Sequence, residues 1–319
     1  MNQQQRMDDA TLVFFDKELE KVKQQTYDVK YNDILARTLF PVDPDAAGPG
    51  ATSISYRQFD QVGIAKIISN YADDLPRVDV AGKQFFSPVR ELGASYGWNI
   101  KELRAAMMAK LNLNARRAIA AREAILRKEH KLALFGDALT GLSGFLSNPN
   151  ISVVTAADNG SGATEWSAKT PDQILADMSN AVGAIMTLTN GVEKPNTLLL
   201  PVDEYVRVST TRMTDGASET VLSFFLKTQA ALGAIDKVYA LPELTEPTAG
   251  WASLGVSFDE PKLMVAYNRD PMKLSMQVAS DFETLPVEAR GLDNIVNCME
   301  SFGGVLIYYP LSVMVVEGI

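Results

Sequence analysis

A long basic run with helical composition constrains this chain more than any other feature. Between Asn99 and Lys131, nine lysine and arginine residues stand against three acidic residues, giving a net charge of +6. The whole chain has a formal net charge of −9, so the remainder carries −15. This asymmetry predicts a long helix that faces acidic surfaces, either neighbouring protein or nucleic acid, instead of an evenly solvated domain.

The limits of this helix follow from its composition. A break is expected near Asn112–Asn114, and good helix formers without Gly or Pro continue from Ala115 to Phe135. Gly136 is expected to end the helix, because glycine adopts the left-handed conformation in which many helices terminate. The apolar positions keep no heptad over this length, so a coiled coil is not predicted.

Composition bounds the class of protein. With 319 residues, 46% of them hydrophobic, the chain can bury one large core or two moderate ones. The pI of about 4.8 argues against an extended nucleic-acid-binding surface but leaves room for one local basic face. Cys298 is the single cysteine, which excludes an internal disulfide framework, and its apolar surroundings predict a buried structural thiol. Neither a signal peptide nor an apolar window of about 20 residues is present, so a soluble, non-secreted protein is expected.

The N-terminal third reads as an arm followed by a ribbon. Apolar residues spaced three and four apart between Leu12 and Val22 predict a short helix in a polar arm. The alternation from Thr52 to Val62 predicts a strand, and the segment AGKQFFSPV predicts its partner after an acidic turn at Tyr71–Pro76. Isolated two-stranded ribbons are marginal in water, so we expect this one to lean on a partner.

The remaining chain predicts an α/β region and then a strand-rich tail. Residues 152–169 read as a loop, and Thr170 is the expected N-cap of a helix that ends near Gly191. Helices and short apolar strands then alternate up to KVYALPEL. The tail from Lys262 predicts strands, with one short helix at Leu292–Ser301. This order predicts two subdomains, of which the outer one is discontinuous.

The order of these segments resembles a known family. After the basic helix comes GDALTGLSGFLSNPNI, in which a Gly-Asp, a Gly-Leu-x-Gly and an Asn-Pro step match the major capsid proteins of tailed bacteriophages, the Hong Kong 97-type fold family. The resemblance covers nearly the whole chain. The matching positions are Gly136, Asp137, Gly141, Leu142, Gly144, Asn148 and Pro149.

The resemblance implies an α+β fold of the Hong Kong 97 type. Its expected parts are an N-terminal arm (1–50), an extended β-ribbon loop (51–98), a peripheral domain with the long spine helix and the β-rich tail (99–140 and 261–319), and an axial α/β domain (141–260).

The resemblance also implies a function and partners. It predicts a structural protein, not an enzyme, that self-assembles into pentamers and hexamers of an icosahedral phage head around double-stranded DNA. It implies portal and possible scaffold or decoration proteins as partners, no membrane and no cofactor, with assembly in the host bacterial cytoplasm before residence in the virion. Two alternatives stay open: an encapsulin-type nanocompartment shell, and a soluble α/β enzyme.

Two sets of residues are candidates for contacts between subunits. The basic helix has three interpretations: it pairs with acidic patches on adjacent subunits, it screens packaged DNA without base readout, or it presents a solvated face. Pairing with subunits is ranked first and DNA screening second. Its candidate residues are Arg104, Lys110, Arg116, Arg117, Arg122, Arg127 and Lys128. On the extended loop the candidates are Asp73, Asp74, Arg77 and Lys83.

Catalytic and binding motifs find little support in the sequence. His130 is the only histidine, so the sequence offers little support for a Ser-His-Asp triad or a histidine-rich metal site. It is expected at the surface. Gly144 is followed by Phe and Leu instead of Lys and Ser/Thr, so the glycines do not form a phosphate-binding loop. Asp281 and Glu283 are expected on a solvated or subunit-facing edge, since nothing nearby predicts an acid/base pair.

Overall fold

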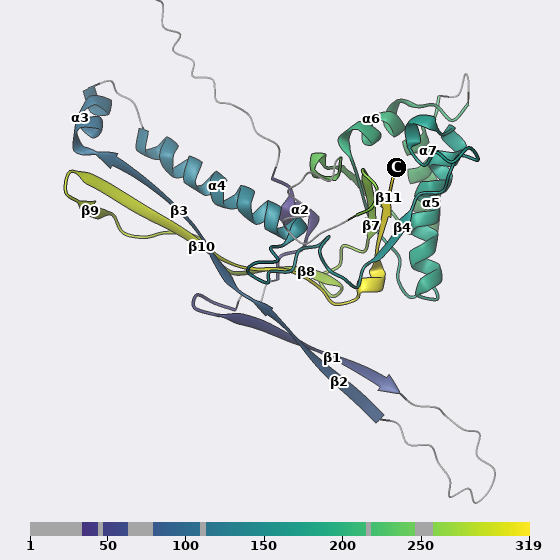
Figure 1. Ribbon diagram of the computed structural model, residues 1–319, viewed down its shortest axis with the longest axis horizontal. Helices are drawn as coiled ribbons and strands as arrows, with labels where there is room; N and C mark the ends of the chain where they lie inside the picture. Colours follow the sequence, from purple (N-terminus) through teal and green to yellow (C-terminus); the bar gives the residue numbers. More distant parts are fainter. Residues whose placement is uncertain (1–33, 44–46, 63–78, 109–112, 215–217, 246–257) are drawn as a thin grey trace, which may run out of the picture. The chain divides into compact units, whose positions relative to one another are not determined.

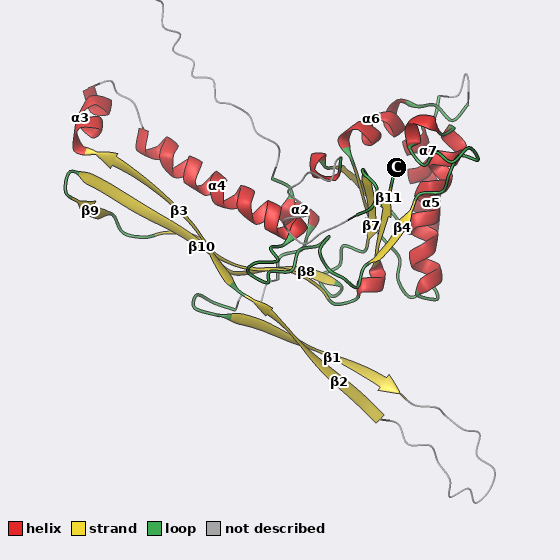
Figure 2. Cartoon of the chain, in the orientation of Figure 1, coloured by secondary structure: helices red, strands yellow, loops and turns green. Residues whose placement is uncertain are grey.

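The computed structural model describes residues 34–43, 47–62, 79–108, 113–214, 218–245 and 258–319. Residues Ile34–Ile319 form one structural unit that contains two larger sheets and a two-stranded ribbon (Figures 1 and 2). The expected arm helix at 12–22 lies outside the described residues. Among the helices that the structure describes, none combines the length and hydrophobicity needed to span a bilayer.

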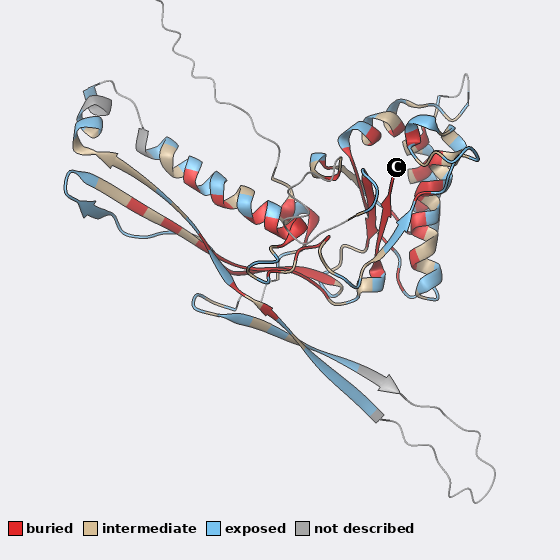
Figure 3. Ribbon diagram, in the orientation of Figure 1, coloured by how far each residue is buried: buried red, intermediate tan, exposed pale blue. Residues whose placement is uncertain are grey.

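The ribbon consists of β1 (Ser53–Val62) and β2 (Asp79–Pro88). The strands pair antiparallel without a bulge, from Ser53 opposite Pro88 to Val62 opposite Asp79. This confirms the two strands that alternation predicts on either side of the acidic turn. Most residues of both strands whose burial is described are exposed (Figure 3).

An antiparallel sheet packs against the longest helix. Its central strand, β10, pairs on one side with β3 and on the other with β8, while the short β9 also pairs with β10. Helix α4 packs on β3 and β10. It ends at Phe135, as predicted. These elements are α3 (Ile100–Met108), α4 (Leu113–Phe135), β3 (Arg90–Asn99), β8 (Leu274–Thr284), β9 (Glu288–Arg290) and β10 (Asp293–Ile307).

The helix predicted at Leu292–Ser301 is wrong, because these residues lie almost entirely in β10. Strand β10 exchanges hydrogen bonds with β3 along ten consecutive residue pairs. Local apolar spacing of three and four gave a helical pattern, but pairing on both sides of a central strand outweighs local preference.

A mixed five-stranded sheet is covered by three helices. The strand order is β4-β11-β7-β5-β6, with parallel pairs at both edges and antiparallel pairs between them. Helix α5 packs on β11 and on α7, and α6 packs on α7 and β6. The elements are β4 (Ser152–Thr155), α5 (Pro171–Leu188), β5 (Thr197–Leu200), α6 (Val202–Thr210), α7 (Val221–Leu232), β6 (Lys237–Ala240), β7 (Leu263–Tyr267) and β11 (Val313–Glu317).

The N-cap predicted at Thr170, at the start of α5, is confirmed. The Thr170 hydroxyl accepts a hydrogen bond from the Gln173 backbone N–H, and the Gln173 side chain accepts one from the Thr170 N–H, so the two form a capping box. The loop predicted at 152–169 is only partly correct, because its first four residues form β4, parallel to β11.

The five-stranded sheet separates two hydrophobic cores. Successive residues of a strand point to opposite faces, so the three central strands β5, β7 and β11 serve both cores. In β7, Val265 and Tyr267 belong to the core shared with α4 and β10, whereas Met264 and Ala266 belong to the core under α5 and α7. Burial on both faces explains why these strands read as unbroken apolar runs. The C-terminal tail contributes β8–β10 to one sheet and β7 and β11 to the other.

Candidate inter-subunit surfaces

The inner face of the ribbon is fastened to the body of the subunit. Tyr56 stacks on Phe85 across the two strands, with ring centroids 5.0 Å apart, and Tyr308 meets the Tyr56 ring edge-on at 4.8 Å. At the end of β2, the buried Ser87 hydroxyl donates a hydrogen bond to the Gly303 carbonyl at 3.0 Å. Lys83, a predicted contact residue, is exposed with its ammonium 4.9 Å from the Phe85 ring centroid. The ribbon is therefore held at its root.

The opposite face of the ribbon carries an apolar stripe. Because alternate residues share a face, Phe59, Val80 and Phe86 all lie on the side away from Tyr56 and Phe85. Their exposed fractions are 65%, 54% and 70%. Exposed aromatic residues gathered on one face are typical of an association surface. We call these three residues the ribbon stripe; they were not among the contact residues predicted from the sequence.

Several basic residues of α4 are engaged within the subunit. Arg117 donates hydrogen bonds from Nη1 to the Gly97 carbonyl at 2.5 Å and to Glu102 at 3.1 Å. This contact lowers the pKa of Glu102. Arg127 pairs with Glu123 one turn away at 2.9 Å. The Arg122 guanidinium lies 5.7 Å from the ring centroid of Phe282.

Other predicted contact residues stay at the surface. Arg104, Arg116 and Lys128 are exposed. Within the described part of the chain, neither Arg104 nor Lys128 forms a hydrogen bond or an ion pair. Four candidates lie outside the described residues, so their surroundings stay predictions: Asp73, Asp74, Arg77 and Lys110.

The surface position expected for His130 is wrong. This residue lies on the side of α4 that faces the short helix η2 (Pro242–Leu244), and it is only 6% exposed. Its Nε2 lies 3.3 Å from Glu243 Oε1. Burial acts to raise the pKa of Glu243, but contact with His130 and a backbone hydrogen bond together lower it. The buried thiol predicted for Cys298 is confirmed, and burial raises its pKa.

The glycine-rich segment after α4 forms a tight turn. Gly136 ends the helix with φ +68°. The backbone N–H groups of Phe145 and Leu146 donate to the carbonyls of Ala133 and Leu134, which would otherwise lack partners at the helix end. The Gly144 N–H donates to Ser147 Oγ at 2.8 Å. The segment closes the helix, so its role is structural.

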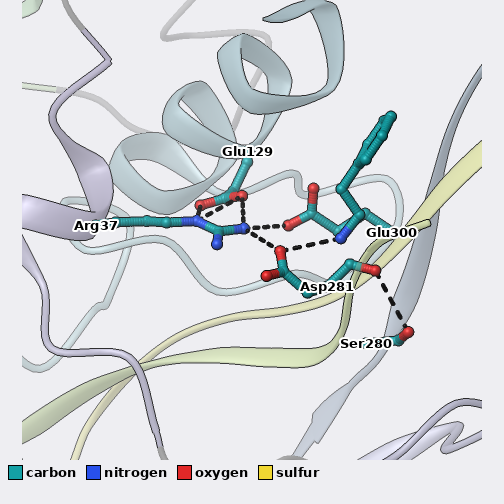
Figure 4. Close-up of polar contacts among 6 residues, drawn as sticks. Arg37, Glu129, Ser280, Asp281 and Glu300 are labelled. Carbon is teal, nitrogen blue, oxygen red and sulfur yellow. Dashed lines mark hydrogen bonds and ion pairs between the residues drawn. The ribbon is translucent and has the colours of Figure 1, made fainter. Parts of the chain in front are cut away.

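A cluster of charged residues joins four elements that are distant in the sequence (Figure 4). Arg37, on the short helix α2 (Ala36–Leu39), donates hydrogen bonds to Glu129 of α4 at 2.8 and 2.9 Å, and to Glu300 of β10 at 2.8 Å. It also donates to Asp281 of β8 at 3.0 Å. We call these four residues the Arg37 cluster.

Two carboxyl groups of the Arg37 cluster are deeply buried. The side chains of Glu129 and Glu300 are 0% exposed, whereas Asp281 is largely exposed. Burial, with a further contribution from the neighbouring Glu129, raises the pKa of Glu300 to about 8. Burial acts to raise the pKa of Asp281, but the hydrogen bond from Arg37, the hydrogen bond from the Phe282 backbone and the charges of Arg37 and Arg122 together lower it. The pKa of Arg37 is raised, mainly by its hydrogen bond with Glu129.

Comparison with known proteins places this architecture among virus shell proteins. The fold matches a subunit in the capsid of Myoviridae Phage XM1, with a TM-score of 0.77 and 16% identity over 95% of this chain and 98% of that one. It also matches Mycobacterium phage Ogopogo, with a TM-score of 0.62 and 15% identity over 95% and 97% of the two chains. A third match is the capsid of a native GTA particle, with a TM-score of 0.61 and 12% identity over 93% and 94%.

The sequence itself identifies the family. No curated protein matches it, but residues 63–319 match the family described as major capsid protein. The chain belongs to this major capsid protein family. Membership confirms the resemblance and the Hong Kong 97-type fold expected from the sequence. It also means that the protein is a structural shell subunit and not an enzyme, which removes the alternative of a soluble α/β enzyme.

Proposed function

We propose that this major capsid protein assembles as pentamers and hexamers into the icosahedral head of a tailed phage, around double-stranded DNA. Support comes from the matches to phage capsids and from the ribbon stripe, an apolar surface that the subunit itself leaves exposed. We assign the ribbon to contacts between copies of the chain. The proposed division into arm (1–50), extended loop (51–98), peripheral domain (99–140 and 261–319) and axial domain (141–260) belongs to the same proposal.

Electron microscopy of purified particles tests this function most directly. Shells with fivefold and sixfold clusters, containing nuclease-protected DNA when made in an infected cell, are the expected result. Particles filled with protein would instead support the encapsulin-type alternative. A well-behaved monomer that forms no particles at any concentration would contradict both.

The ribbon stripe predicts a variant that folds but does not assemble. Replacing Phe59 and Phe86 together by serine removes two exposed aromatic groups, and buried aromatic anchors often contribute about 2 kcal/mol or more to an interface. We expect the particle yield to fall at least about tenfold, measured by sedimentation. Circular dichroism should stay unchanged, because both side chains lie outside the cores.

Gln58→Ser provides a matched control for the ribbon variant. Gln58 is also exposed on β1 but lies on the opposite face, so its replacement should leave assembly intact. Normal particles from the double variant, or equal loss from the control, would contradict the assignment of the stripe to an interface.

The basic residues of α3 and α4 offer a second test. Arg104 and Lys128 are exposed, and their replacement by glutamate reverses two charges that have no described partner. If they face acidic patches on adjacent subunits, as we propose, the variant should need more salt to assemble, because salt screens the new repulsion. If they face packaged DNA, empty shells should form normally and only DNA retention should fall. Assembly measured against salt concentration, with and without DNA, separates these outcomes.

A further inference from the structure

The N-terminal segment Ile34–Asp43 is held on the body by apolar contacts and by several hydrogen bonds, which include backbone hydrogen bonds of Pro41 and Asp43 with Met276. Its only helix, α2, has four residues, too few to be stable alone, so its position depends on tertiary contacts. Leu39 and Phe40 are buried in the core beside α4, and the Tyr267 hydroxyl donates to the Leu39 carbonyl at 2.8 Å. Arg37 extends from the same helix turn into the Arg37 cluster.

The Arg37 cluster contains more negative than positive charge. When Glu129, Glu300 and Asp281 are all ionised, three carboxylates face one guanidinium, and two of them are inaccessible to water. Burying like charges together is unfavourable, so one of the buried carboxyl groups retains a proton. Asp281 is exposed, and Arg37 contacts Glu129 through both Nε and Nη2 but Glu300 through Nη2 alone, so Glu300 is the group that holds the proton.

The charged groups around the Glu300 carboxyl group determine how firmly it holds its proton. Helix α4 presents Glu129, helix α2 presents Arg37 and strand β8 presents Asp281, which in turn lies in the field of Arg122. On β3 the residue opposite Glu300 is the apolar Leu92. Arg37 is the only cation among these groups that touches Glu300, and it is shared with Glu129 and Asp281.

We propose that the Arg37 cluster is a proton-dependent latch, which fastens the segment Ile34–Asp43 to α4, β8 and β10 while Glu300 is protonated and loosens it when Glu300 ionises (Figure 4). The proposal concerns contacts within one subunit, so it does not depend on the proposed shell function.

The sign of the pH dependence follows from linkage. A carboxyl group whose pKa is higher in the fastened state binds more protons there than in the loosened state. The contribution of Glu300 to the latch is therefore largest below the ordinary pKa of glutamate, weakens as the pH rises, and is smallest above about 8, the pKa of buried Glu300. Each unit of elevation corresponds to about a tenfold change in the fastening equilibrium.

Hydrogen–deuterium exchange of the full-length protein tests the latch. The readout is the protection of the peptide that covers residues 34–43, corrected for intrinsic exchange at each pH. We expect wild-type protection to fall at least about tenfold between about pH 6 and about pH 9. Glu300→Gln, which mimics the protonated carboxyl group, should keep the segment protected over the whole range.

A matched control separates the latch from general effects of charge. Glu283→Gln removes a carboxylate from an exposed position on the same sheet, so its pH profile should equal that of the wild type. The proposal is overturned if wild-type protection does not change with pH, or if Glu300→Gln follows the wild-type profile. The wild-type measurement alone decides the matter if the Glu300 variant does not fold.

Discussion

Gly144→Ala is expected to destabilise the subunit by about 4 kcal/mol or more, the range reached only when a substitution conflicts with fixed structure. A Cβ atom at residue 144 would lie 2.1 Å from the Gly136 nitrogen and 2.4 Å from the Phe135 carbonyl carbon. Both atoms belong to the backbone at the end of α4, so a side-chain rotation cannot relieve the clash. Urea unfolding of the soluble protein, or its soluble yield, measures the effect.

Gly183→Ala is the control for this prediction. Gly183 lies inside α5, and a Cβ atom there would meet nothing within 4 Å. Alanine has fewer backbone conformations than glycine in the unfolded chain and favours the helix. We therefore expect the free energy of unfolding to increase by about 0.5–1 kcal/mol. Equal stability of the two variants would show that residue 144 can move away from the backbone of Phe135 and Gly136 without loss of the fold.

The turn and the ribbon show what the sequence could predict. Both depend on signals contained within a short segment: glycines after a helix, and polar-apolar alternation on either side of a turn. The two-stranded ribbon and the end of α4 at Phe135 were therefore predicted close to their observed limits. The surface stripe of Phe59 and Phe86 could have been found too, because the strand pattern already placed these residues away from Tyr56 and Phe85.

Features that depend on distant segments could not be predicted in this way. Arg37 is separated by 92 residues from Glu129 and by 263 from Glu300, and no local pattern links them. The predicted helix at 292–301 failed for the same reason, because β10 exists through its pairing with β3 and β8. The lone His130 looked like a surface residue among charged neighbours, yet its side of α4 meets η2.

Arg37→Gln is expected to destabilise the subunit by about 3–5 kcal/mol near neutral pH, the usual cost of removing one partner from a buried ionic cluster. The variant leaves buried Glu129 without its cation, and this carboxyl group cannot reach water. Unfolding by urea measures the free energy, with Glu129→Gln combined in a second variant that should recover part of the loss.

The pH dependence of this loss distinguishes a buried cluster from an ordinary surface ion pair. The lost cation matters only while the carboxyl groups that it faced are charged, so the deficit should shrink on acidification toward the ordinary pKa of glutamate, about 4.3. Arg290→Gln is the control, since it breaks an exposed pair with Glu288 and should cost less than about 1 kcal/mol at any pH. A loss at Arg37 no larger than at Arg290 would mean that the buried cluster contributes no more than a surface ion pair. The segment Ile34–Asp43 would then be held by its other contacts, which include buried Leu39 and Phe40, the hydrogen bond from the Tyr267 hydroxyl to the Leu39 carbonyl, and backbone hydrogen bonds with Met276.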